Sequence, residues 1–188
     1  MQIVFSGQTE FRLKNPDLKL IIGSQEVPKE DCDLVILNNP NLENLPTKQK
    51  ILNWPGEYEI QGVMTTIFNL SKNYQEPIYA FKFLFEELAF GWLPKLEKIT
   101  EKIEEQFGTI DILFLTSQVS SEVSQNILES LEPKIVIPMD FDSSEIATLA
   151  QKFNFGQSEP LSELKIKKSE LKAEHMEFKI LTNQKLAN

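Results

Sequence analysis

The sequence predicts a single α/β domain in which mixed β-sheets are covered by helices. Its first half consists of short apolar segments separated by Asn-Pro, Gly and Asn-rich breaks, a pattern typical of a largely antiparallel meander. In the second half, apolar residues recur at helical spacing, and these segments alternate with short buried strands. Strands that feed helices in this order indicate crossover connections and a parallel portion of sheet. No repeat or linker divides the chain, so we expect one domain over residues 1–188.

Strand-like segments fill the first half of the chain. They span residues 2–5, 10–13, 18–22, 33–37, 50–54, 58–70 and 77–88. The aromatic residues of the last segment alternate along the chain, which is more typical of a sheet core than of a surface that stacks on nucleotide bases.

Three helices are expected in the second half. The first begins at Pro94 and ends at Gly108, and the second ends before Pro133. The third begins with a capping-box-like pair, Asp142 and Glu145. Strands are expected between these helices at 110–115 and 134–139, and the segment 164–172 is expected to be a half-exposed strand followed by a turn of helix.

Composition and charge exclude several classes of function. The 19 basic and 28 acidic side chains give a net charge of −9, which repels polyphosphates, so we expect no nucleic-acid partner. No apolar run approaches the ~18–20 residues of a membrane span, and the first residues lack the pattern of a signal peptide. The single cysteine, Cys32, excludes an internal disulfide and lies between Asp31 and Asp33, whose charges oppose a thiolate. We therefore expect a cytoplasmic protein with an inert thiol and no membrane association.

The stretch "DLVILNNPNLENL" (33–45) raises a question of its own, because a buried strand runs directly into four asparagines and a glutamate. Taken alone, Asn-Pro-Asn is ordinary loop chemistry, in which amide side chains bond to nearby backbone groups. Two further stretches change this interpretation. They are "WPGEYEIQGV" (54–63) and "LEPKIVIPMDF" (131–141).

Together and in this order, the three stretches resemble the metallo-β-lactamase fold superfamily, in particular its small bacterial Zn-dependent-hydrolase-like branch. In that branch a buried strand runs into T-H-x-H-x-D-H, a G-E-Y-E-V-x-G-V hairpin follows, and a strand ending in H-x-G-D precedes L-E-P-K-I-V-I-P-M-H-Y. The resemblance implies an αββα sandwich, that is, two mixed β-sheets with helices on both outer faces.

The resemblance also places the family's metal ligands on residues of this sequence that are not histidine. An early G-H-S-x-F element corresponds to "GQTEF" (7–11), and the H-x-G-D element corresponds to "FGW" (90–92). The positions that the family uses for its pocket fall on Gln8, Asn38, Asn39, Asn41, Glu43, Asn44, Phe90, Trp92 and Asp140.

Zinc catalysis requires imidazole and carboxylate ligands and an open position for a water molecule. Asparagine offers only a weak neutral oxygen, and the indole of Trp92 offers no lone pair. We therefore expect a metal-free pseudoenzyme that retains a vestigial pocket, holds no zinc, and has a binding or structural role. Its partner is a protein or small molecule that the sequence does not identify, and a homo-oligomer is one possibility.

The sequence leaves open an alternative with a different metal. Asn39, Asn41, Glu43 and Asp140 form an oxygen-rich set that could ligate Mg²⁺, Ca²⁺ or Mn²⁺ in a divergent metal-dependent hydrolase. The only histidine, His175, lies among charged residues near the C-terminus, where we expect it on the surface.

The carboxylates Glu57 and Glu59 share one face of a strand, which is also the spacing of a paired general acid and base. In the family this G-E-Y-E element lies outside the metal ligands. We therefore expect it to have a structural or interface role.

Overall fold

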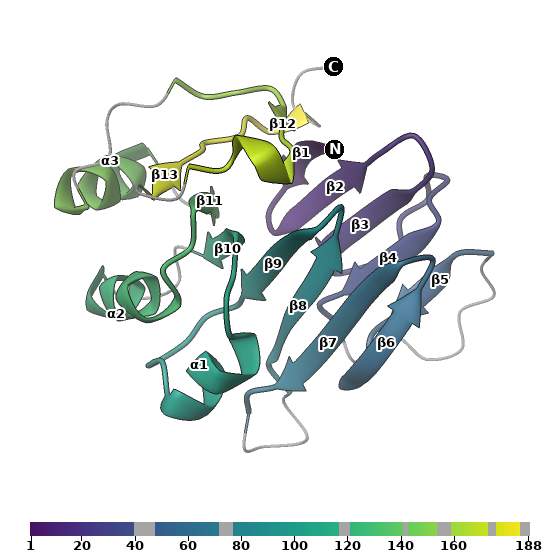
Figure 1. Cartoon of the computed structure of the whole chain (residues 1–188), viewed down its shortest axis with the longest axis horizontal. Coiled ribbons are helices and arrows are strands. Elements are labelled where there is room, and N and C mark those ends of the chain that lie inside the picture. Colours follow the sequence, from purple (N-terminus) through teal and green to yellow (C-terminus); the bar gives the residue numbers. More distant parts are fainter. Residues whose placement is uncertain are drawn as a thin grey trace.

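The computed structural model of the chain describes residues 1–39, 48–71, 77–116, 121–140, 143–153, 159–172 and 176–184. Within these residues, thirteen strands form two β-sheets that stack face to face, and the helices gather on one side of the stack (Figure 1).

The first sheet has six strands in the order β12-β1-β2-β3-β4-β5. Strands β12, β1, β2 and β3 are antiparallel neighbours, whereas β3, β4 and β5 run parallel. The bounds are Gln2–Gly7 (β1), Glu10–Lys14 (β2), Lys19–Ser24 (β3), Leu34–Leu37 (β4), Lys50–Leu52 (β5) and Leu164–Lys165 (β12). The turn of helix predicted after β12 is present as the 3₁₀ helix Lys168–Glu170.

The second sheet has seven strands in the order β13-β11-β10-β9-β8-β7-β6. Strands β6 to β9 form an antiparallel meander, and β9, β10, β11 and β13 are parallel. The bounds are Gly56–Ile60 (β6), Val63–Asn69 (β7), Tyr79–Phe85 (β8), Leu88–Leu93 (β9), Ile112–Thr116 (β10), Ile135–Met139 (β11) and Glu177–Phe178 (β13).

Two details of this sheet differ from the strands expected from alternation, and both agree with the resemblance. The segment 58–70 is a hairpin, as the family's G-E-Y-E-V-x-G-V element implied, because Gln61 and Gly62 have φ angles of 51° and 80° that reverse the chain. The strand β9 is the one that the resemblance ends at "FGW" (90–92), whereas alternation had carried the preceding strand through the tight turn Glu86–Glu87.

The three α-helices are α1 (Glu101–Phe107), α2 (Ser121–Leu131) and α3 (Ser143–Lys152). Their apolar residues, among them Phe107 and Ile127, pack with Leu113 and Val136 on the outer face of the seven-stranded sheet. The first helix begins later than predicted, because the Thr100 side chain accepts a hydrogen bond from the backbone N–H of Ile103 and caps it there. None of the helices in the described residues has the length and apolar character of a membrane span.

The outer face of the six-stranded sheet is covered differently. Its apolar residues pack against Val27 and Cys32, which come from the segment that connects β3 and β4. In the described ranges no α-helix lies on this face. The predicted sandwich of two mixed sheets is therefore confirmed, but its described helices lie on one outer face, where the prediction had placed them on both.

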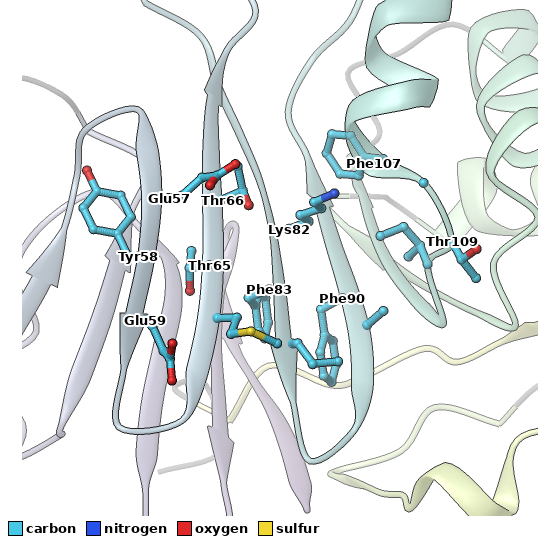
Figure 2. A pocket seen from close by; sticks show the side chains of 15 residues that line it. Glu57, Tyr58, Glu59, Thr65, Thr66, Lys82, Phe83, Phe90, Phe107 and Thr109 are labelled. Carbon is cyan, nitrogen blue, oxygen red and sulfur yellow. The ribbon is translucent and has the colours of Figure 1, made fainter.

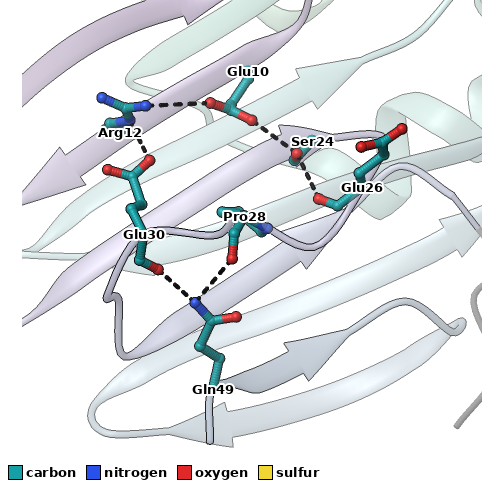
Figure 3. A network of polar contacts seen from close by, with 7 residues as sticks. All are labelled: Glu10, Arg12, Ser24, Glu26, Pro28, Glu30 and Gln49. Atoms are coloured by element: carbon teal, nitrogen blue, oxygen red, sulfur yellow. Dashed lines mark hydrogen bonds and ion pairs between the residues drawn. The ribbon is translucent and has the colours of Figure 1, made fainter. Parts of the chain in front are cut away.

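Side-chain contacts hold the connecting segment 25–33 against the sheet (Figure 3). Arg12 on β2 forms an ion pair with Glu30, with 2.7 Å between Nε and Oε1. Gln49 donates hydrogen bonds from Nε2 to the carbonyl oxygens of Pro28 (3.2 Å) and Glu30 (2.6 Å). These contacts join three separate parts of the chain, so a loop can cover a face that would otherwise need a helix.

The core between the two sheets is rich in aromatic rings. Phe11 on one sheet contacts Phe114 on the other, with 4.5 Å between ring centroids. Trp92 stacks on Phe81 at 4.8 Å, and one edge of its indole approaches Gly23 of the opposite sheet. Because Gly23 has a φ of 70°, it both fits the backbone conformation and leaves room for the indole.

We predict that Gly23→Ala lowers the free energy of unfolding by about 2–5 kcal/mol, from left-handed strain and overpacking together. A methyl group there would lie 2.2 Å from the Thr9 carbonyl oxygen and 2.7 Å from Trp92 Nε1. Gly62→Ala is the matched control, since its φ is 80° but no atom lies within 4 Å, so it should lose only about 1–2 kcal/mol. Urea denaturation measures both values, and equal losses would contradict this account of the packing.

Candidate functional site

A cleft of about 1360 Å³ lies where several strands end. Its lining includes Asn38 directly after β4, Pro94 directly after β9, Thr116 at the end of β10 and Asp140 directly after β11. Ligand sites of α/β proteins gather outside the carboxyl ends of such strands. The fold therefore places this cleft where a functional site is expected.

Four of the residues predicted for the vestigial pocket line this cleft. They are Gln8, Asn38, Trp92 and Asp140. They come from both sheets and from distant parts of the sequence, so the fold brings together residues that only the family pattern connected. Asn41, Glu43, Asn44 and His175 lie outside the described residues.

Two other predicted residues do not line the cleft. Asn39 directs its amide Nδ2 to the carbonyl oxygen of Gln25 at 2.9 Å, so its amide group is used in holding the chain. Phe90 is buried between the sheets, where it stacks on Phe83 with 4.6 Å between centroids. Phe90 therefore belongs to the core.

Trp92 lines the cleft from the core between the sheets. The side chain is 1% exposed, and its Nε1 group has no hydrogen-bond partner among the described residues. A buried N–H without an acceptor costs about 1–3 kcal/mol. The apolar packing against Phe81 is thus what holds the indole in place.

Asp140 is the one carboxylate of the predicted pocket that lies in the described part of the cleft. Its φ of 59° is unusual for a residue that follows a buried strand directly, and strained backbone of this kind is concentrated at functional sites. Desolvation raises the pKa of the Asp140 carboxyl above its ordinary value. The neutral form of this side chain is therefore favoured more than in a free aspartate, which weakens it as a metal ligand.

A wall of the cleft carries positive charge that the sequence analysis did not identify. Lys95, Lys98 and Lys102 all line it, and none of them forms an ion pair with a described carboxylate. The lysines lay within a predicted helix of which only the apolar face was interpreted. With Glu97 and Asp140 as the acidic side chains of the described lining, the charge of this lining is +3 − 2 = +1, in a protein whose overall charge is −9.

The side chains in the described part of the cleft do not fit zinc. They supply neutral amides, two carboxylates and an indole, whereas zinc sites use imidazole, thiolate and carboxylate ligands. Within the described residues, no group of three or more His, Cys, Asp or Glu side chains is placed to hold a metal ion.

The thiol of Cys32 lies away from this cleft, on the outer face of the six-stranded sheet. Burial, followed by the charges of Glu30, Asp33 and Asp31, raises the pKa of Cys32 to about 11. The thiolate is therefore scarce at neutral pH, in agreement with the inert thiol expected from the sequence.

A second cavity, a groove of about 650 Å³, lies on the outer face of the seven-stranded sheet beside α1 (Figure 2). The carboxylates Glu57 and Glu59 line it together with Met64 and Lys82. Among the residues that the structure describes, none lines both cavities. The G-E-Y-E element is thus separate from the cleft.

The two stacked mixed sheets, with a cleft at their strand ends, define a sandwich of the metallo-β-lactamase type. The family model described as "Beta-lactamase superfamily domain" matches residues 2–140. The chain belongs to this family, as the sequence motifs had predicted.

Solved structures show the same fold at low sequence identity. A protein assigned to the Zn-dependent hydrolases of the metallo-β-lactamase superfamily from Thermotoga maritima is 17% identical, with a TM-score of 0.76 over 96% of this chain and 97% of that chain. The metallo-β-lactamase fold protein YhfI from Bacillus subtilis is 8% identical, with a TM-score of 0.62 over 96% of each chain. A protein assigned as a metal-dependent hydrolase from Parabacteroides distasonis is 16% identical, with a TM-score of 0.63 over 95% of this chain and 91% of that chain. No curated protein gives a significant match.

We predict that Trp92→Asp, which restores the family's residue type, destabilises the protein by more than about 4 kcal/mol. The change removes a buried aromatic side chain and puts a charge in its place. Trp92→Phe keeps an apolar ring and loses no hydrogen bond, so it should cost only about 1–3 kcal/mol. Chemical denaturation compares the two variants. Similar stabilities for both would mean that the Trp92 position is hydrated and not a packed site.

Proposed function

We propose that this protein is a metal-independent, non-hydrolytic member of its family that binds a small organic anion in the cleft. One observation carries the proposal: the residues of the predicted pocket that line the described part of the cleft are the amides Gln8 and Asn38, the indole of Trp92 and the carboxylate of Asp140. Such a set lacks the ligands that would lower the pKa of a bound water to about 7, so it supplies no nucleophile for hydrolysis.

The lysine wall supports an anionic ligand. Lys95, Lys98 and Lys102 are exposed toward the cleft and have no described ion-pair partner, so their ammonium groups are available to phosphate or carboxylate oxygens. The amides of Gln8 and Asn38 add neutral hydrogen-bonding groups at the other side.

The apolar part of the lining indicates that the ligand also has a hydrocarbon portion. This part consists of Leu70, Ile78, Pro94, Leu96, Ile103 and Met139. Ile78 is 42% exposed, which is unusual for isoleucine and leaves apolar surface to be covered. An aryl or alkyl phosphate or carboxylate satisfies both the charged and the apolar surface, whereas a nucleic acid would be repelled by the net charge of −9.

The oxygen-rich metal site that the sequence left open gains no support from the described residues. Asn39 donates from Nδ2 to the backbone carbonyl of Gln25 and does not line the cleft, and Asp140 is the one described member of the set that does. We also propose a cytoplasmic location, which rests on the single buried thiol.

The test uses Trp92 as the reporter. The chain has two tryptophans, so a Trp54→Phe background leaves the cleft indole as the single emitter. We predict that phenyl phosphate or phenylacetate changes its fluorescence in a saturable way, whereas phenol does not. Comparing the two anions distinguishes a phosphate from a carboxylate preference.

Replacing the lysine wall tests the charge directly. In the same background, we predict that Lys95→Gln, Lys98→Gln and Lys102→Gln together weaken anion binding roughly tenfold, since exposed ion pairs contribute up to about 1 kcal/mol each. Lys14→Gln, Lys19→Gln and Lys50→Gln make the same change of net charge on exposed residues outside the cleft lining, and should leave binding unchanged. Equal effects of the two triple variants would contradict an anion site here. Release of phenol from phenyl phosphate by zinc-supplemented protein, lost on Asp140→Ala, would show instead that the protein is a hydrolase.

A further inference from the structure

Strand β6 is the edge of the seven-stranded sheet, and the register of its hairpin shows which backbone groups are free. Ile60 pairs with Val63 across a two-residue turn, so these two residues exchange hydrogen bonds. In an antiparallel pair the bonded residues alternate, so Tyr58 also bonds to β7. The N–H and C=O groups of Glu57 and Glu59 therefore point away from β7, and no described residue pairs with them.

The side chains of Glu57 and Glu59 lie on the outer face of the sheet, at the rim of the groove (Figure 2). Cross-strand pairing places Glu57 next to Thr66 and Glu59 next to Met64, so β7 offers no cation to either. Both carboxylates are exposed, and neither forms an ion pair with a described cation.

The nearby lysine does not neutralise them. Lys82 on β8 donates from Nζ to the carbonyl oxygen of Gln106 at 2.5 Å, and Figure 2 shows its side chain directed toward α1. Two uncompensated carboxylates therefore lie beside the free backbone groups of the same strand. A cationic partner could use both.

The helix layer leaves this part of the sheet open. Phe107 of α1 packs against Gly91 on β9, but the groove floor between that helix and β6 contains Met64, which is 49% exposed. The opposite side chains of β6, Tyr58 and Ile60, are partly buried against the core. An added strand would thus meet acidic groups on one face and apolar groups on the other.

A second copy of this chain does not meet these requirements. If two β6 strands paired antiparallel about Tyr58, Glu57 of one copy would face Glu59 of the other. Like charges directly opposite each other destabilise a strand pair, and natural edge strands use such charges to prevent self-association.

We propose that β6 accepts an extended segment of a partner protein as an eighth strand, with Lys or Arg at alternate positions and apolar residues between them. The backbone groups of Glu57 and Glu59 supply the pairing, as in other cases of strand addition. Their carboxylates select the basic face of the segment, and Tyr58 and Ile60 contact its apolar face.

The test uses capped seven-residue peptides, one alternating Lys with Val and a matched one alternating Glu with Val. Trp54, which is 64% exposed and lies just before β6, reports binding by fluorescence in a Trp92→Phe background. We predict saturable binding of the Lys peptide alone, weakening as salt rises. Absence of binding at 1 mM, a concentration typical of weak recognition, would overturn the proposal.

Two variants separate strand addition from general attraction to an acidic protein. The double variant Glu57→Lys with Glu59→Lys should bind the Lys peptide roughly tenfold or more weakly, because opposite-charge pairs become like-charge pairs. The same variant should bind the Glu peptide, whose charges are then opposite to those of the strand. Glu26→Lys with Glu122→Lys changes the net charge equally at exposed residues away from the groove and should have little effect. Equal losses in the two variants would overturn the proposal.

The backbone contribution is tested by Glu59→Pro. Proline removes the outward N–H of Glu59 but none of the hydrogen bonds to β7, so the edge strand should remain folded. Because proline also removes the Glu59 carboxylate, the comparison is with Glu59→Ala, which loses the carboxylate but keeps the N–H. We expect Glu59→Pro to bind the Lys peptide about tenfold more weakly than Glu59→Ala does, as on losing one well-formed hydrogen bond. Equal affinities of the two variants, both with thermal midpoints near wild type, would refute strand pairing.

Discussion

The packing of Trp92 is the constraint on which the cleft depends. The indole stacks on Phe81 within its own sheet and meets Gly23 from the opposite sheet, so it fixes the distance between the two layers at the end of β9. A residue that fills this space cannot also act as a metal ligand. The stability of the sandwich and the chemistry of its cleft are therefore set by the same side chain.

The cleft does not require metal-binding side chains for its shape, because the ends of the strands form it. Strands β4, β9, β10 and β11 end beside it, whatever the residues that follow them. The amides of Gln8 and Asn38 keep hydrogen-bonding groups in the lining, and the lysines of the 94–102 segment supply positive charge. On our proposal, that charge takes the role of attracting anionic groups that a metal ion has in a zinc hydrolase.

Most of the fold could be predicted from the sequence. The spacing of apolar residues within a segment and the turn residues between segments are local signals. Alternation identified β8, and Pro133 and Gly108 marked the ends of helices. Local signals did not separate β9 from β8, because the tight turn Glu86–Glu87 has no Gly or Pro to mark it, and only the family pattern placed a strand there. The family pattern identified Gln8, Asn38, Trp92 and Asp140 as neighbours, which no local signal could do. Phe90 lies on the same strand as Trp92 but does not line the cleft, since residues two apart on a strand share a face but need not reach the same cavity. The lysine wall could not be predicted, because the direction in which residues 94–100 leave the sheet is set by tertiary packing.

The central claim is that the cleft works without a metal ion. Elemental analysis of protein purified without chelator, followed by calorimetric titration with zinc, tests it most directly. We predict far less than one equivalent of any divalent metal and no saturable zinc binding at neutral pH. One equivalent of zinc, magnesium, calcium or manganese that survives dialysis, is lost on Asp140→Ala and is kept by His175→Ala would contradict it.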